Sequence, residues 1–117
     1  MKLKPFSLAV LFILFGCDSD DAEPIVDVAI SNGKLQCQEN ALPLETTKGY
    51  LLEAAVDVIA EYCGIENSPV VTECGATENQ IHIFTINEKG LNKAENIGFI
   101  EASSLEDGYK IVDCEDL

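Results

Sequence analysis

The 117-residue chain has room for one compact domain and leaves none for separate substrate and cofactor domains. Its 21 acidic residues face seven basic ones, all lysine, and the formal net charge of -14 excludes nucleic-acid binding because it repels phosphates. The absence of arginine argues against a nucleotide or phosphopeptide site, and we expect the acidic surface to keep the protein soluble and monomeric.

The first 16 residues have the layout of a signal peptide. A basic start is followed by an apolar segment from Phe6 to Phe15 and by the small residue Gly16. Eleven helical residues would span only roughly 16 Å of a hydrocarbon core about 30 Å thick. The segment is therefore too short to cross a membrane, and we expect residues 1–16 to be removed.

The sequence Leu14-Phe15-Gly16-Cys17 resembles the lipobox of bacterial lipoproteins. Phe15 is bulkier than the residue usual at its position in that family. The resemblance implies cleavage before Cys17 and lipid on that cysteine, with two or more acyl chains giving stable anchoring. The expected location is the cell envelope, facing the periplasm or the cell exterior. The choice between inner and outer membrane stays open.

Residues 17–24 form an acidic segment with no apolar surface worth burying, which predicts an extended tether that carries the lipidated Cys17. Asp18 and Asp20 have the spacing of a calcium loop, but Ala22 and Glu23 stand where an oxygen ligand and a glycine are needed. We therefore expect no metal site here.

Residues 25–117 are expected to form a single α+β domain. The branched residues of 25–30 predict a strand, and the turn at 31–33 favours a hairpin with 34–38. Apolar spacing predicts a helix over 43–55, and residues 56–63 alternate as a strand does. Asn40 is a candidate cap for that helix.

The second half begins with a loop in which only Val70-Val71-Thr72 could extend. The β-branched and aromatic content of 80–86 predicts the clearest strand of the chain. Asn87 is a natural cap for a short helix over 88–97, and Gly98 suits its left-handed end. A last strand is predicted over 109–114, while 99–105 is compatible with strand or loop.

The element order predicts a ferredoxin-like βαββαβ fold, a two-layer sandwich with an antiparallel sheet and an optional extra strand at the start. This fold hosts many functions and implies none.

The domain also resembles a group of small exported bacterial proteins of unknown function. The matching residues within 34–99 are Leu35-Gln36-Cys37-Gln38-Glu39, Cys63-Gly64, Cys74-Gly75, Ile81-His82-Ile83-Phe84 and Gly98-Phe99. The resemblance supports the fold and implies no activity.

Four cysteines remain when Cys17 is assigned to lipid, an even number in a compartment where disulfides form. Three pairings are open, and we favour Cys63–Cys74, which leaves Cys37 for Cys114. Redox catalysis is disfavoured because the chain has no Cys-x-x-Cys, and zinc is disfavoured because the cysteines are widely spaced. No cofactor is expected.

His82 is the chain's single histidine and lies in a strand with apolar neighbours, which is typical of a packed residue. A catalytic role would need a serine such as Ser68, Ser103 or Ser104, and none has a nucleophile motif around it. The carboxylates are so numerous that a pair at catalytic spacing could occur anywhere in the fold, so their presence does not indicate catalysis.

We therefore expect a membrane-anchored envelope lipoprotein that binds a protein or small ligand and is not an enzyme. The first alternative is a small envelope hydrolase that uses His82 with carboxylates, which predicts a concave pocket around His82. The second is a structural or inhibitory domain that recognises an edge strand, which predicts an exposed strand edge or apolar patch.

Overall fold

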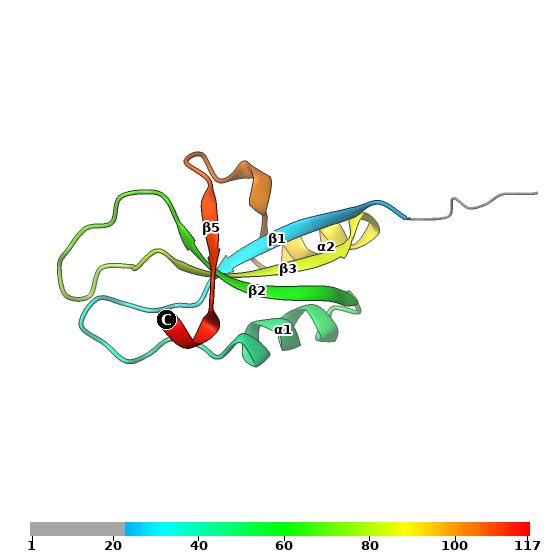
Figure 1. Cartoon of the computed structure of the whole chain (residues 1–117). Helices are drawn as coiled ribbons and strands as arrows, with labels where there is room; N and C mark the ends of the chain where they lie inside the picture. Colours follow the sequence, from blue (N-terminus) through cyan, green and yellow to red (C-terminus); the bar gives the residue numbers. More distant parts are fainter. Residues whose placement is uncertain (1–22) are drawn as a thin grey trace, which may run out of the picture.

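The fold is known from a computed structural model, which describes residues 23–117. The predicted signal peptide and Cys17 lie outside these residues. The described part is a small α+β structure with a five-stranded antiparallel sheet, two helices and two disulfides (Figure 1).

The sheet has the order β4-β1-β3-β2-β5. Its strands are β1 (Ile25–Ser31), β2 (Val58–Glu66), β3 (Gln80–Asn87), β4 (Ile100–Glu101) and β5 (Tyr109–Val112). The central strand β3 pairs along its length with β1 and β2, and the short strands β4 and β5 form the edges. The strand predicted over 80–86 is confirmed, because buried β-branched and aromatic side chains favour the centre of a sheet.

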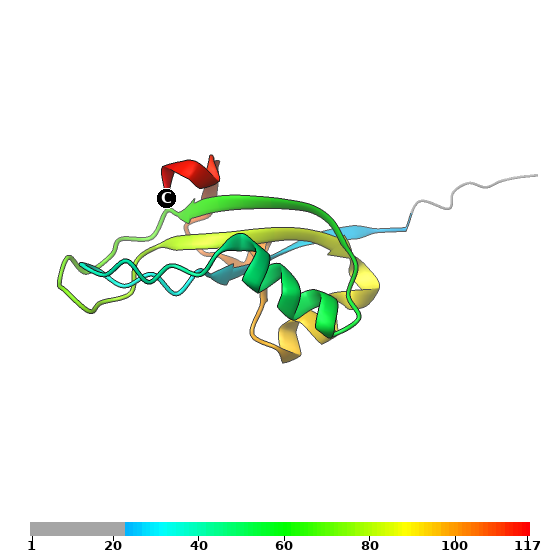
Figure 2. The same cartoon turned by 90° about the horizontal axis from the view of Figure 1, so that it is seen from below.

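Both helices cover one face of the sheet. Helix α1 (Leu44–Glu53) contributes Leu51, and α2 (Leu91–Asn96) contributes Ala94, to a core that also contains Phe84. The Phe99 ring meets the Phe84 ring edge-on with centroids 6.0 Å apart. Figure 2 shows the helices along the same side of the sheet.

The opposite face has a smaller core. Ile81 and Ile83 of β3 pack there with Ala29 and Ala102, partly covered by Leu105. The segment between β4 and β5, which includes the 3-10 helix η3 (Ala102–Ser104), supplies this cover. The sheet is therefore covered by helices on one side and by a loop on the other.

The helix predictions are confirmed with shorter bounds. Pro43 precedes α1 in an extended conformation, but no side chain caps the helix. The prediction for Asn40 is wrong, because its side chain binds the backbone of Gly33 and Leu35 instead. Asn87 accepts a hydrogen bond from the Lys89 amide, and the predicted helix divides into the 3-10 helix η2 (Glu88–Gly90) and α2. Gly98 has a φ of 106° and ends it as expected.

Two strand predictions need correction. Residues 34–38 do not form a hairpin with β1, because Gly33 and Cys37 have φ angles of 79° and 68° and the segment turns toward Thr77. The strand predicted over 109–114 ends at Val112, because the 3-10 helix η4 (Cys114–Asp116) follows it, and it pairs with β2. Strand β4, from the segment compatible with strand or loop, pairs with β1.

Candidate functional site

His82 is the first candidate residue, and the structure places it inside the helix-covered face. Its side chain is 2% exposed, and its Nδ1 lies 2.7 Å from the Thr47 Oγ1 of α1. The Thr47 hydroxyl also donates to the Leu44 carbonyl oxygen at 3.2 Å. With that bond made, His82 Nδ1–H can donate to Thr47 Oγ1, so the pair links β3 to α1.

Burial lowers the pKa of His82 below its ordinary value of 6.5, because it disfavours the charged imidazolium. Burial is the single cause, so no carboxylate within residues 23–117 offsets it. Burial therefore favours the neutral ring, and its contact with Thr47 is one that a packed histidine makes.

The three candidate serines lie elsewhere in the fold. Ser68 Oγ is 3.5 Å from carboxylate oxygens of Glu66 and Asp107. Ser103 and Ser104 donate to Glu101, to its carboxylate and its carbonyl oxygen. None of these hydrogen bonds involves His82, so the described fold does not bring the expected histidine and serine together.

A small hollow lies beside His82, with a volume of about 220 Å³. Residues 41–44, the Cys63–Cys114 disulfide and Leu117 line it. Pockets for small molecules are larger, roughly 300–1,000 Å³, and have a few convergent polar groups. The polar side chains of the lining are those of Asn32 and His82, and each already makes a hydrogen bond within the fold, so the hollow suits packing better than chemistry.

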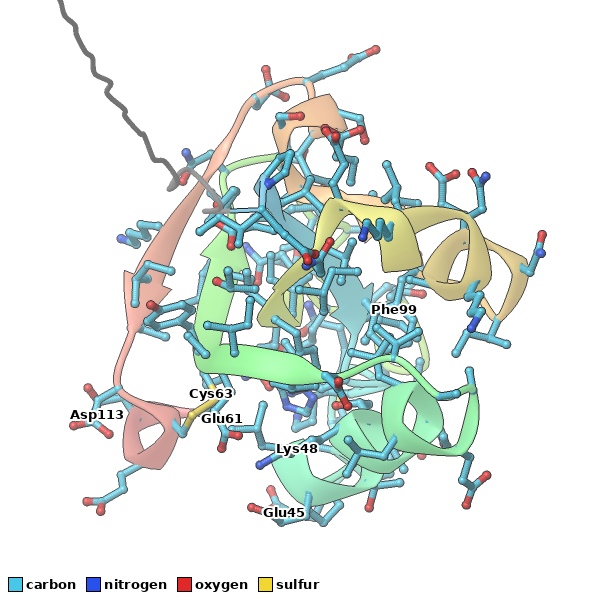
Figure 3. All side chains as sticks on the ribbon, turned by 90° about the vertical axis from the view of Figure 1, so that its right-hand side faces the viewer. Glu45, Lys48, Glu61, Cys63, Phe99 and Asp113 are labelled. Carbon is cyan, nitrogen blue, oxygen red and sulfur yellow. A yellow bond between two sulfur atoms is a disulfide. The ribbon has the colours of Figure 1, made fainter. Side chains whose placement is uncertain are left out.

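An ion pair joins α1 to β2. Lys48 Nζ lies 2.8 Å from Glu61 Oε1, and Figure 3 shows the two side chains meeting. The hydrogen bond and attraction to Glu61 raise the pKa of Lys48, and Glu45 adds to the effect. Glu61 neutralises the charge of Lys48, so this lysine is unavailable to an anionic ligand.

All four cysteines of residues 25–117 are in disulfides, but the favoured pairing is wrong. The bonds are Cys37–Cys74 and Cys63–Cys114, with Cα–Cα distances of 5.2 and 5.1 Å. Cys63 lies within β2 and Cys114 follows β5, which pairs with β2. Strand pairing therefore decided the partner of Cys63, and the remaining two cysteines met in the loops.

The Cys37–Cys74 bond joins two loops that we call the distal loops, residues 33–42 and 67–79. They project from the end of the sheet opposite the start of β1, on the left in Figures 1 and 2. Beyond the disulfide, Leu35 bridges Thr77 and Lys34 forms a 2.9 Å ion pair with Glu78. The loops are thus held to each other.

At the base of the distal loops Asn32 is 2% exposed, and both its side chain and its backbone are hydrogen-bonded. Its side chain donates to Gln80 Oε1 at 2.8 Å and accepts from the Lys34 amide at 3.0 Å. Its carbonyl accepts from the Leu42 amide at 2.7 Å. A buried amide that makes these bonds holds the loop base in one conformation.

The tip of the distal loops is exposed. Val70 and Val71 are 37% and 61% exposed, and the amides of residues 68 and 70–73 donate to no other backbone group of the described chain. The exposed Glu39 and Glu73 lie on the same loops. This surface can accept a partner through apolar contacts and free backbone groups. In the sequence, the one indication of this surface was that residues 70–72 could form an extended segment.

Together these features define a disulfide-bonded α+β protein with a small core and an exposed pair of cross-linked loops. Comparison with protein-family models, with curated proteins and with solved structures found no match. Among residues 23–117 no group of three or more His, Cys, Asp or Glu side chains is placed to hold a metal. No helix in this part has the length and apolar character of a membrane span.

Proposed function

We propose that the protein is a bacterial envelope lipoprotein, anchored by lipid on Cys17, whose domain binds a protein partner and has no enzymatic activity. The signal-peptide layout and the resemblance to the lipobox support the anchor. Two disulfides in a 12.7 kDa chain support export, because such bonds persist in oxidising compartments.

The observation that carries the binding role is the separation between the start of the domain and the distal loops. The eight residues of β3 run between these two ends, a length of about 26 Å. A tether that enters at one end leaves the distal loops pointing away from the membrane. A cross-linked loop pair loses less entropy on binding than two independent loops, which favours recognition there.

We also propose a fold class that goes beyond the observed order of strands in the sheet. We propose that β1–α1–β2 and β3–α2–β4 are the two halves of a ferredoxin-like arrangement, with β5 added beside β2. The order β4-β1-β3-β2 within the sheet supports it. The fold by itself carries no function.

The anchor is tested by expressing the full chain in a Gram-negative host and measuring the intact mass of the membrane-extracted protein. We expect a chain that begins at an acylated Cys17, with four further cysteines alkylated only after reduction. Cys17→Ser should lose the acyl mass and leave the membrane fraction. An unacylated wild-type chain outside the membrane would overturn the proposal.

The binding role is tested by photo-crosslinking in cells of the native host, with a photoreactive residue at Val71 and a matched control at Ile111. Both side chains are exposed, at 61% and 53%, but they lie on the distal loops and on β5. We expect one discrete crosslinked protein from position 71, lost in Cys37→Ser/Cys74→Ser. Equal crosslinking from both positions would contradict recognition by the distal loops.

A further inference from the structure

The end of the domain where the chain enters carries exposed apolar side chains. We call Ile25, Leu52 and Ile59 the proximal rim, with exposures of 59%, 52% and 58%. Ile25 begins β1, Leu52 lies in the last turn of α1, and Ile59 lies near the start of β2. These three segments meet at the right-hand end in Figure 1, the end that faces the viewer in Figure 3.

The backbone turns these side chains outward. The β2–β3 register shifts between Val58 and Ala60, so Ile59 has no partner on β3. Such a bulge redirects a side chain that regular pairing would place over the sheet. Leu52 follows the fully buried Leu51, and a helix turns by about 100° per residue, so Leu52 points away from the core. The rim is therefore a surface, not an incomplete core.

The length of chain before the domain determines what lies near this rim. Only six residue steps separate Cys17 from Glu23, and at full extension they reach about 20 Å. Glu23 is fastened to the domain by Asn87 and by a 3.5 Å ion pair with Lys89. An acyl group on Cys17 therefore keeps this end close to the bilayer.

We propose that the proximal rim rests on the lipid bilayer and orients the domain with its distal loops outward; this rests on the proposed lipid anchor. The tether raises the local concentration of membrane, so weak apolar contacts are enough. The exposed charges at this end are Glu23, Glu53, Asp57 and Glu88 against Lys89 and Lys93. Four acids and two lysines favour a zwitterionic surface over an anionic one.

The chain contains no tryptophan, so a single introduced tryptophan reports depth in the membrane without background. The acylated full-length protein carrying Ile25→Trp, Leu52→Trp or Ile59→Trp is reconstituted in phosphatidylcholine vesicles, with Val71→Trp as the matched control. We expect shorter-wavelength emission and about a twofold loss of intensity with brominated phosphatidylcholine at the rim positions, and neither at position 71. Phosphatidylglycerol vesicles should weaken the effect.

The outcome separates the rim from the anchor. If the intact mass shows no acyl group, the anchor proposal fails, and Cys17, the one cysteine outside the two disulfides, is coupled to a maleimide phospholipid instead. The rim is then tested on the same vesicles. If tryptophans at positions 25, 52 and 59 emit like the one at position 71, the proximal rim does not rest on the bilayer, and the proposal is overturned in either preparation. That result is also the one expected if a protein partner covers the rim. Equal quenching at all four positions overturns the proposed orientation.

Discussion

At the scale of single residues, His82 shows how a chemically capable side chain becomes structural. The apolar neighbours in the sequence predicted a packed histidine, and the structure shows it 2% exposed against Thr47. The amino-acid sequence could not show that α1 would place the Thr47 hydroxyl beside His82 Nδ1, because the packing of α1 on β3 brings these two residues together.

The buried ring makes stability depend on pH. The folded pKa of His82 lies below 6.5, so the unfolded chain binds more protons, and stability falls as the pH drops below about 6.5 toward the folded pKa. The slope cannot exceed roughly 1.4 kcal/mol per pH unit. Denaturant unfolding of wild type and His82→Gln between about pH 7.5 and about pH 5.5 measures it, since glutamine does not titrate. Equal pH dependence in both proteins would contradict this account.

Gly64 of β2 is required by close packing. A Cβ there would lie 2.7 Å from Ile83 Cδ1 and 3.0 Å from the Lys110 carbonyl oxygen. Ile83 is fully buried and Lys110 contributes backbone, so neither can move freely. The glycine lets β5 and β3 approach this strand together.

Alanine substitution should therefore act in opposite directions at two glycines. Gly64→Ala is expected to lower the free energy of unfolding by about 1–3 kcal/mol through overpacking. Gly49→Ala, inside α1 with open space around its Cβ, should raise it by about 0.5–1 kcal/mol. Denaturant unfolding measures both. A neutral Gly64→Ala would mean that the neighbouring strands relax.

At the scale of elements, the two disulfides differ in their surroundings. Cys63 is 2% exposed within β2 and its partner Cys114 is exposed, whereas Cys37 and Cys74 are both exposed in loops. A disulfide is reduced by direct attack of a thiolate, so access to sulfur controls the rate.

Limited reduction should open Cys37–Cys74 before Cys63–Cys114. We expect alkylation after brief treatment with dithiothreitol to label positions 37 and 74 first, as measured by peptide mass mapping. The same map of unreduced protein checks the pairing itself. Initial labelling at Cys63 and Cys114 would contradict this order and show that attack on the exposed Cys114 sulfur is the faster route.

At the scale of the whole molecule, the structure has a sheet core and a loop pair that depends on its own cross-link. The distal loops contribute none of the fully buried large apolar side chains, all of which belong to the sheet, the helices or the segment after α2. Loops without such burial depend on hydrogen bonds and on the disulfide for order.

Removing that cross-link should loosen the loops and spare the sheet. In Cys37→Ser/Cys74→Ser we expect faster amide hydrogen exchange over residues 33–42 and 67–79, with β3 still protected. The chain-entropy model gives a loss of up to about 4 kcal/mol in overall stability for a loop of this size. Uniformly faster exchange, measured by mass spectrometry at peptide resolution, would show that loops and sheet unfold as one unit.

Local signals in the sequence were sufficient for α1, β3 and the start of the second helix, because apolar spacing, β-branched content and the Asn87 cap act within a few residues. The tertiary structure alone decided the disulfide partners, the place of residues 109–112 beside β2, and the role of 34–38 as a loop. These features depend on which strand edges meet. Contacts between residues far apart in sequence leave no local pattern, because they follow from the packing of the whole sheet.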